Sequence, residues 1–181
     1  MIAGRIQMIR ACQRLSQRLT LLVGVMLWFA MSAAHAVHSC TISVGTLNFG
    51  VYSGAQVNSS STMTVTCTLT AGIVDTVNYT GTLSTGASGS YAQRQLTNLS
   101  LPSDTLPYNL YLGTVPAALN TNVWGDGTGG TITATGMFTL IVFFSPIGTA
   151  NYTVAGAIPA VAVVPAAGTY NDTIVATLTF N

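Results

Sequence analysis

Residues 63–69 read Met63-Thr64-Val65-Thr66-Cys67-Thr68-Leu69, with apolar side chains at the odd positions and threonine at the even ones. Successive side chains of a β-strand point to opposite faces, so this alternation predicts a strand with one buried face. Cys67 is expected to point inward together with Met63, Val65 and Leu69.

The end of the chain repeats this pattern. Ile174, Ala176, Leu178 and Phe180 fall on one face of a strand, with threonine at most of the positions between them. Elsewhere, short runs rich in Thr, Val, Ile, Tyr and Phe are separated by Gly, Asn, Ser and Pro, which is typical of an all-β sandwich. The expected strands are Thr41–Val44, Leu47–Val51, Ser61–Leu69, Thr76–Ser84, Gln95–Leu99, Tyr108–Leu112, Thr131–Phe144, Gly148–Ala160 and Tyr170–Phe180.

Two glycine-rich segments, Gly86–Ser90 and Trp124–Gly130, are predicted as loops, because glycine reaches positive φ at little cost. Pro159 and Pro165 flank the apolar stretch 160–164. Proline cannot donate to a β-ladder, so this stretch is not expected to be an uninterrupted central strand.

The first 36 residues have the composition of a signal peptide. Four arginines precede the apolar run Leu21–Met31, and Ala34-His35-Ala36 provides an A-x-A cleavage site. The alternative is an uncleaved anchor, although a spanning helix needs about 20 apolar residues. Met8 is an alternative start. We therefore expect a signal peptide at 1–36 and one exported domain at 37–181.

The expected mature domain has almost no charge. It contains four aspartates, a single cation, Arg94, and neither lysine nor glutamate, for a net charge of about −3. Nucleic-acid binding requires several cations to neutralise phosphates, and a polybasic membrane site requires a cluster of them. Both classes of partner are excluded.

Two cysteines remain after cleavage, Cys40 and Cys67. An even pair in an oxidising compartment predicts a disulfide between them. The alternative is a pair of buried free thiols.

The residues needed for catalysis are nearly absent. His38 is the single histidine of the mature domain, and the aspartates are scattered along the sequence. Neither a Ser–His–acid triad nor a zinc spacing can be assembled, so we expect no enzyme activity, metal or cofactor. Asp172 is expected to brace the turn before the last strand, and Asp126 to lie in a tight turn. Trp124 could provide a sugar-stacking surface, with an aromatic lid on the sandwich as the alternative.

Taken in order, a series of short motifs resembles the spore coat protein U family, the pilin-like domain of archaic chaperone–usher pili. They are Cys40, Phe49-Gly50-Val51-Tyr52, Cys67, Tyr91 with Arg94, Tyr108-Asn109-Leu110-Tyr111, Trp124-Gly125-Asp126-Gly127, Tyr152–Pro159 and Gly168–Val175. Each motif is weak alone, and their order across the mature domain is specific.

This resemblance implies an immunoglobulin-like sandwich that lacks its last strand. In the family a periplasmic chaperone lends a strand to the resulting groove. At an outer-membrane usher the N-terminal extension of the next pilus subunit replaces it, by β-strand addition. We place the donor-strand groove between two sets of residues: Ile42, Val44, Leu47 and Phe49 on one side, and Ile174, Ala176, Leu178 and Phe180 on the other. The alternative is that all eight belong to a closed core.

The chain departs from the family in one respect. Cleavage after Ala36 leaves only three residues before Cys40, and extended chain covers only about 3.3–3.6 Å per residue. The subunit is thus expected to accept a donor strand without providing one, as a tip-like subunit or a surface coat protein that does not polymerise. It would pass through the periplasm to the cell surface and contribute to adhesion and biofilm. The alternative function is a secreted adhesin or lectin-like module.

Overall fold

The computed structural model describes residues 36–181, which form one compact unit from Ala36 to Asn181. The predicted signal segment therefore lies almost entirely outside the described residues. The described part is all-β, as the sequence predicts. Its single helical turn, η1 (Gly86–Ser88), is three residues long, so nothing helical within 36–181 could cross a bilayer.

Nine strands make up the domain. They are β1 (Val37–Val44), β2 (Val57–Ala71), β3 (Val74–Leu83), β4 (Arg94–Asn98), β5 (Thr105–Leu112), β6 (Ala134–Ile141), β7 (Ile147–Ile158), β8 (Tyr170–Asn171) and β9 (Ala176–Phe180).

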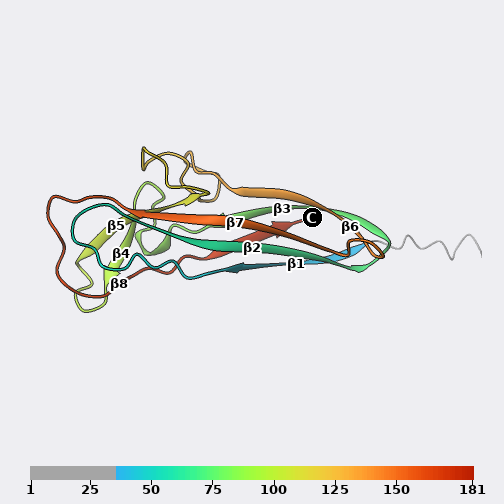
Figure 1. Cartoon of the computed structure of the whole chain (residues 1–181), viewed down its shortest axis with the longest axis horizontal. Helices are drawn as coiled ribbons and strands as arrows, with labels where there is room; N and C mark the ends of the chain where they lie inside the picture. Colours follow the sequence, from blue (N-terminus) through green and yellow to red (C-terminus); the bar gives the residue numbers. More distant parts are fainter. Residues whose placement is uncertain (1–35) are drawn as a thin grey trace, which may run out of the picture. The chain divides into compact units, whose positions relative to one another are not determined.

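The strands form two antiparallel sheets. One has six strands in the order β1-β2-β7-β5-β4-β8, and the other has three in the order β6-β3-β9. Figure 1 shows the long strands side by side, with the longer loops gathered at one end of the domain. The first and last long strands, β1 and β9, are edge strands of different sheets.

The core lies between the sheets and depends on the alternation in β2. Met63, Val65 and Cys67 are fully buried and Leu69 is nearly so, whereas the threonines between them are partly exposed. The predicted inward face of this strand is confirmed. Burying such side chains contributes about 1.5–3 kcal/mol each to folding.

The predicted disulfide is also confirmed. Cys40 of β1 lies directly opposite Cys67 of β2 in the strand register, and the two are joined by an S–S bond. The bond ties an edge strand to the interior of its sheet.

The predicted strand Leu47–Val51 is wrong. These residues belong to no ladder, although Leu47 and Phe49 still turn half-buried side chains inward. Gly50 has a φ of 72°, and its N–H donates to the Asn48 side chain at 2.8 Å. This local turn interrupts the extended run, and β2 bonds to it through a side chain, Ser59 Oγ to the Asn48 carbonyl at 2.6 Å, where a ladder would use backbone groups.

The predicted strand Tyr170–Phe180 is in fact two strands. β8 pairs with β4 in the larger sheet, and β9 pairs with β3 in the smaller one. Residues 172–175 carry the chain from one sheet to the other, so the alternating side chains continue while the hydrogen-bonding partner changes. The predicted Thr131–Phe144 is likewise too long, because β6 spans only Ala134–Ile141.

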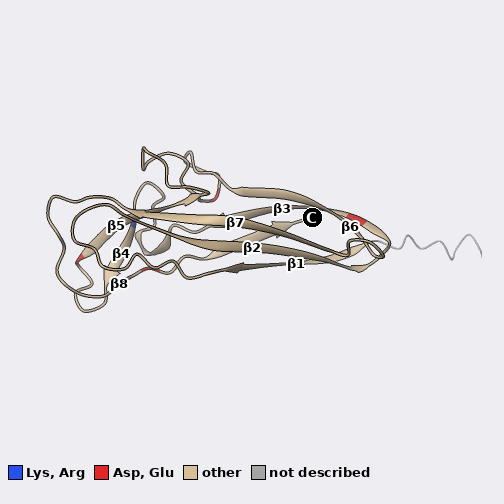
Figure 2. Cartoon of the chain, viewed as in Figure 1, with Lys and Arg blue, Asp and Glu red and all other residues tan. Residues whose placement is uncertain are grey.

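Arg94, the single lysine or arginine of the described domain, lies in β4, and its side chain is completely buried. Figure 2 colours charged residues and shows how few the domain has. Its guanidinium donates to the carbonyls of Ser84 and Trp124 at 2.7–3.0 Å and to Asn109 Oδ1 at 2.7 Å. Its Cζ lies 5.2 Å from the centre of the Tyr91 ring. Burial lowers the pKa of Arg94. The arginine thus joins two connecting segments, those of Ser84 and Trp124, to strand β5 through one buried group.

We predict that trypsin cleaves after Arg94 only when the domain unfolds, because this sole tryptic site within residues 37–181 has no exposed surface. Mass spectrometry along a urea series should show the Arg94 cut appearing with the loss of native Trp124 fluorescence. Chymotrypsin is the control, since Phe143 and Phe144 are 84% and 87% exposed and should be cut in the native state. Rapid tryptic cleavage at Arg94 without urea would contradict the buried placement.

Candidate functional site

Four strands lie at sheet edges in the part of the chain that the structure describes: β1, β8, β6 and β9. An edge strand presents unpaired N–H and C=O groups, and proteins usually blunt such edges. The β8 edge is blunted by its length of two residues.

The β6 edge is capped near both ends. The Tyr152 hydroxyl donates to the Thr135 carbonyl at 3.0 Å. At the other end, the N–H of Ile141 and that of Ser145 donate to each other's carbonyl at 2.9 and 2.8 Å. The edges of β1 and β9 have no comparable cap.

The backbone of β9 pairs on one side only. The Val175 carbonyl accepts from the Ser84 N–H, and the Val175 N–H donates to Ser84 Oγ, both at 2.9 Å. At the far end the Asn181 N–H donates to the Asn78 carbonyl at 3.2 Å. Because successive residues of an antiparallel strand direct their N–H and C=O to opposite sides, the odd positions 175–181 face β3.

The even positions of β9 therefore direct their backbone groups away from β3, and no strand within 36–181 pairs with them. These residues are Ala176, Leu178 and Phe180. They are also the residues whose side chains form the inward apolar face, so backbone edge and apolar face coincide.

The same reasoning applies to β1. The Gly45 N–H donates to the Thr62 carbonyl at 3.0 Å, which places the odd positions of β1 toward β2. The N–H and C=O groups of Cys40, Ile42 and Val44 then face outward, again without a partner strand in the described chain.

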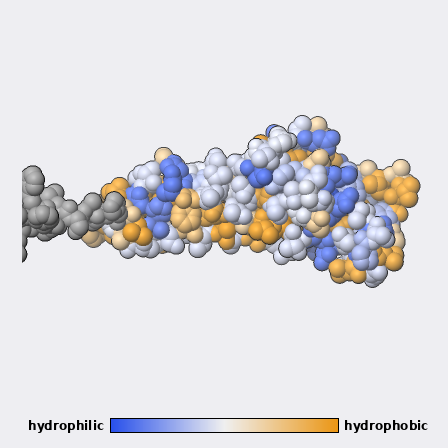
Figure 3. Space-filling model, turned by 180° about the vertical axis from the view of Figure 1, so that it is seen from behind, coloured by the Kyte–Doolittle hydropathy of each residue, from blue (hydrophilic) through white to orange (hydrophobic). Residues whose placement is uncertain are grey.

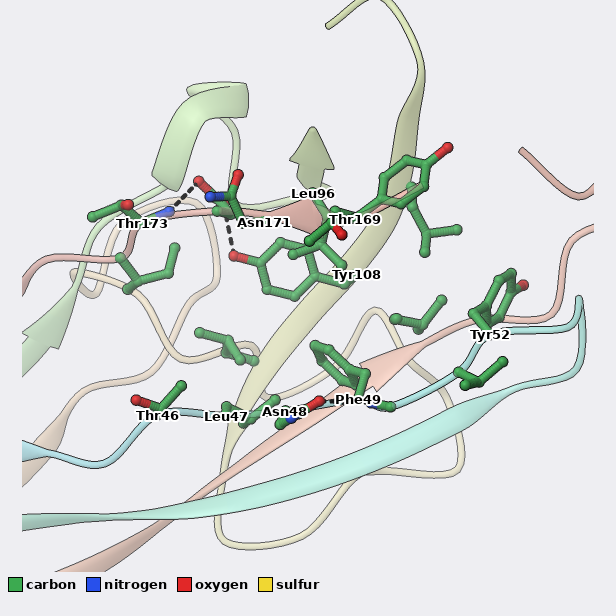
Figure 4. Close-up of a pocket in the computed structure, with 18 of the residues that line it drawn as sticks. Thr46, Leu47, Asn48, Phe49, Tyr52, Leu96, Tyr108, Thr169, Asn171 and Thr173 are labelled. Carbon is green, nitrogen blue, oxygen red and sulfur yellow. Dashed lines mark hydrogen bonds between the residues drawn. The ribbon is translucent and has the colours of Figure 1, made fainter. Parts of the chain in front are cut away.

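A groove with a volume of about 970 Å³ lies at one end of these two edges, where Val44 of β1 and Ala176 of β9 line it (Figure 4). Residues 44–52, which follow β1, form one wall. Residues 164–174, together with Ala176, form the other. The floor is made of leucines from β3, β4 and β5, with Tyr108 of β5 and with Val154 and Ile158 of β7.

In the groove wall that follows β1, the Leu47 and Phe49 side chains pack against Gly156. A Cβ added to Gly156 of β7 would lie 2.8 Å from the Phe49 ring and 3.0 Å from Leu47. Since this is closer than van der Waals contact allows, glycine is required for both side chains to pack on the floor.

The structure brings five of the eight predicted groove residues together. Those that line the groove are Val44, Leu47, Phe49, Ile174 and Ala176. The remaining three, Ile42, Leu178 and Phe180, lie beyond it along β1 and β9, where the His38 ring approaches the Phe180 ring to 5.5 Å. His38 Nδ1 also lies 2.6 Å from Asp75 Oδ2, so β1 is tied to β3 at this end.

At one position along the groove, Tyr108 and Asp172 place a hydroxyl and a carboxylate side by side, a contact that the sequence did not reveal. The Tyr108 hydroxyl donates to Asp172 Oδ2 at 2.7 Å, and the Tyr108 ring packs edge-on against Phe49 at 6.0 Å (Figure 4). Burial, followed by the bond to Asp172, raises the pKa of Tyr108. Phe49, Tyr108 and Asp172 therefore form a continuous series of side-chain contacts across the floor, from one wall of the groove to the other.

Trp124 is not a surface contact, and that prediction is wrong. Its side chain is completely buried, and its Nε1 donates to the Gly81 carbonyl at 3.1 Å. The indole is therefore part of the core and cannot stack on a sugar. Asp126, two residues further on, is exposed and accepts from the Thr128 N–H at 2.9 Å, as expected in a turn.

No group of three or more His, Cys, Asp or Glu side chains gathers anywhere in the described domain. Its surface in Figure 3 is mostly polar, with separate apolar patches. The exposed apolar residues include Val51 beside the groove and Val163 near its other wall.

A family model described as Spore Coat Protein U domain matches residues 27–177. Protein U of Myxococcus xanthus is 32% identical over 146 residues, which cover 75% of this chain and 72% of that protein. A solved structure described as "Chaperone-tip adhesin complex is vital for synergistic activation of CFA/I fimbriae biogenesis" contains a chain that is 14% identical, with a TM-score of 0.42. The match covers 78% of this chain and 42% of that one.

We predict that alkaline pH destabilises the domain through Tyr108 and Tyr79, whose pKa values are raised mainly by burial. The folded state holds these protons more tightly than the unfolded chain does. Stability is therefore complete below the ordinary tyrosine pKa of about 10 and declines as the pH rises beyond it. The urea midpoint, followed by Trp124 fluorescence, should fall between about pH 10 and 12, and Tyr108→Phe should lessen this fall. An unchanged midpoint across this range would contradict the burial of both hydroxyls.

Proposed function

Because the chain belongs to the Spore Coat Protein U domain family, we propose that it is a structural subunit of a chaperone–usher pilus or a surface coat that accepts a donor β-strand. The strand would come first from a periplasmic chaperone and then, at an outer-membrane usher, from another pilus subunit. The assembled subunit would act at the cell surface in adhesion and biofilm formation.

One observation carries this proposal: the two edges without a cap, those of β1 and β9, both reach the same groove, at Val44 and at Ala176. Strand addition requires an unpaired backbone edge for affinity and pockets for alternate side chains for specificity. The outward backbone groups of Val44 and Ala176 supply the edge at the groove. Ile174, Leu47 and the floor leucines supply the pockets.

The geometry also constrains the incoming strand. The His38 ring, near the start of β1, contacts the ring of Phe180 at the end of β9, so the two edge strands run in opposite directions. A strand lying in the groove at the other end of these two strands, beside Val44 and Ala176, would be antiparallel to one and parallel to the other. It would join the two sheets along their open side.

The proposal is tested by periplasmic co-expression with a pilus chaperone. The wild-type domain should be recovered as a 1:1 complex whose urea midpoint exceeds that of the domain alone. A soluble monomer that is equally stable without the chaperone would contradict the proposal.

We predict that Ala176→Pro weakens the complex while leaving the domain folded. The Ala176 N–H is not used by β3, and proline is tolerated where an edge N–H has no partner. In the complex, the substitution would leave a donor-strand carbonyl unpaired at a cost of about 1–3 kcal/mol.

Ala176→Gly is the matched control, because it keeps the N–H. Protection of Arg94 from trypsin shows that each variant is folded. Equal urea midpoints for the proline and glycine complexes would show that this edge does not accept the strand.

A further inference from the structure

Asp172 is the one charged residue among the described residues that line the groove. The inward-facing series of this wall continues through Ile174 and Ala176, and the opposite wall of residues 44–52 contains no charge. A strand lying in the groove would meet apolar and uncharged polar side chains and a single charged group, that of Asp172.

The carboxylate of Asp172 is held in place from three directions. Oδ1 accepts from the N–H of Ala87 at 3.0 Å and of Thr173 at 2.7 Å, and Oδ2 accepts from Tyr108 at 2.7 Å. A carboxylate offers about four acceptor positions, so one remains. The group is partly buried, and its orientation is fixed before any partner arrives.

No cation of the described domain forms an ion pair with this carboxylate. The Arg94 side chain donates its hydrogen bonds to Ser84, Trp124 and Asn109, and His38 is paired with Asp75. With one buried cation and four aspartates, the domain has no exposed lysine or arginine to offer. Arg94 lies near enough for its charge to interact with Asp172 but makes no hydrogen bond to it, so a cation that donates to this carboxylate would have to come from the strand that enters the groove.

An apolar groove alone specifies register poorly. A slip of one residue turns every side chain to the wrong face, but a slip of two residues restores the alternation and is resisted only by differences in shape. A single polar position in an apolar interface is a well-attested means of fixing register.

Building on the function proposed above, we propose that Asp172, positioned by Tyr108, sets the register of the donor strand by pairing with a basic side chain. The partner would be an extended segment with apolar residues at alternate positions and a lysine or arginine at the level of Asp172. Its ammonium or guanidinium would donate to the free acceptor position of the carboxylate.

The test uses two synthetic peptides of about nine residues, the length that spans residues 44–52 when extended. Both alternate serine with valine or leucine. One has lysine at a central inward position, and the other has norleucine, which has a similar aliphatic chain without the charge. Binding to the exported protein is measured by calorimetry at low and high salt.

The lysine peptide should bind at least about tenfold more tightly, the lower range for a hydrogen bond to a charged group. This preference should shrink with salt and disappear in Asp172→Asn. It should persist in Asp126→Asn, which removes an exposed aspartate from a loop outside the groove. Moving the lysine by two positions should shift by two residues the peptide protons that show nuclear Overhauser contacts to the Phe49 ring.

Three results overturn the proposal. Equal binding of the two peptides to the wild-type protein, or a lysine preference that survives Asp172→Asn, would remove the register role and leave strand acceptance intact. Failure of both peptides to bind would instead contradict strand acceptance itself. The salt dependence in the wild-type protein decides the matter even if Asp172→Asn does not fold.

Discussion

This structure depends on the backbone N–H and C=O groups of two edge strands, β1 and β9, that have no partner strand in the described chain. In β9 every second residue bonds to β3, and the residues between them direct N–H and C=O groups to an open side. In β1 the same alternation leaves the N–H and C=O groups of Cys40, Ile42 and Val44 without a partner strand in the described chain. Backbone polar groups that are removed from water without a partner cost free energy, so an apolar groove beside such edges is stable when another strand fills it. The contrast with β6, whose ends are capped by Tyr152 and Ser145, shows that the fold blunts one long edge and leaves these two open.

The rest of the domain holds the groove walls in place. The disulfide fixes β1 to β2, and His38 ties the start of β1 to β3 through Asp75. On the other side, the segment that passes from β8 to β9 is anchored by Asp172 to η1 and to Tyr108. These contacts order the walls in the free domain, so the proposed binding of a strand would lose less conformational entropy. The near absence of exposed charge is consistent with a subunit whose main contacts are backbone hydrogen bonds and apolar side chains.

The sequence predicts the side-chain faces well and the backbone partners poorly. Alternation in 63–69 correctly identified the buried face of β2, because burial acts on every second side chain of any strand. The same alternation misled us at Leu47–Val51, which packs inward without a ladder, and at 170–180, where the partner sheet changes. Trp124 among glycines suggested an exposed loop, but its burial depends on Gly81 from a distant strand. The contact between Tyr108 and Asp172 likewise joins residues 64 positions apart.

Amide hydrogen exchange along β9, measured residue by residue by NMR, tests the central claim most directly. The account predicts that Thr177 and Thr179 are protected in the free protein because they bond to β3. Ala176, which lines the groove, should exchange rapidly there and become protected when a chaperone strand occupies the groove. Protection of Ala176 equal to that of Thr177 in the free monomer, or its continued rapid exchange in the complex, would contradict the claim that this edge is open and accepts a strand.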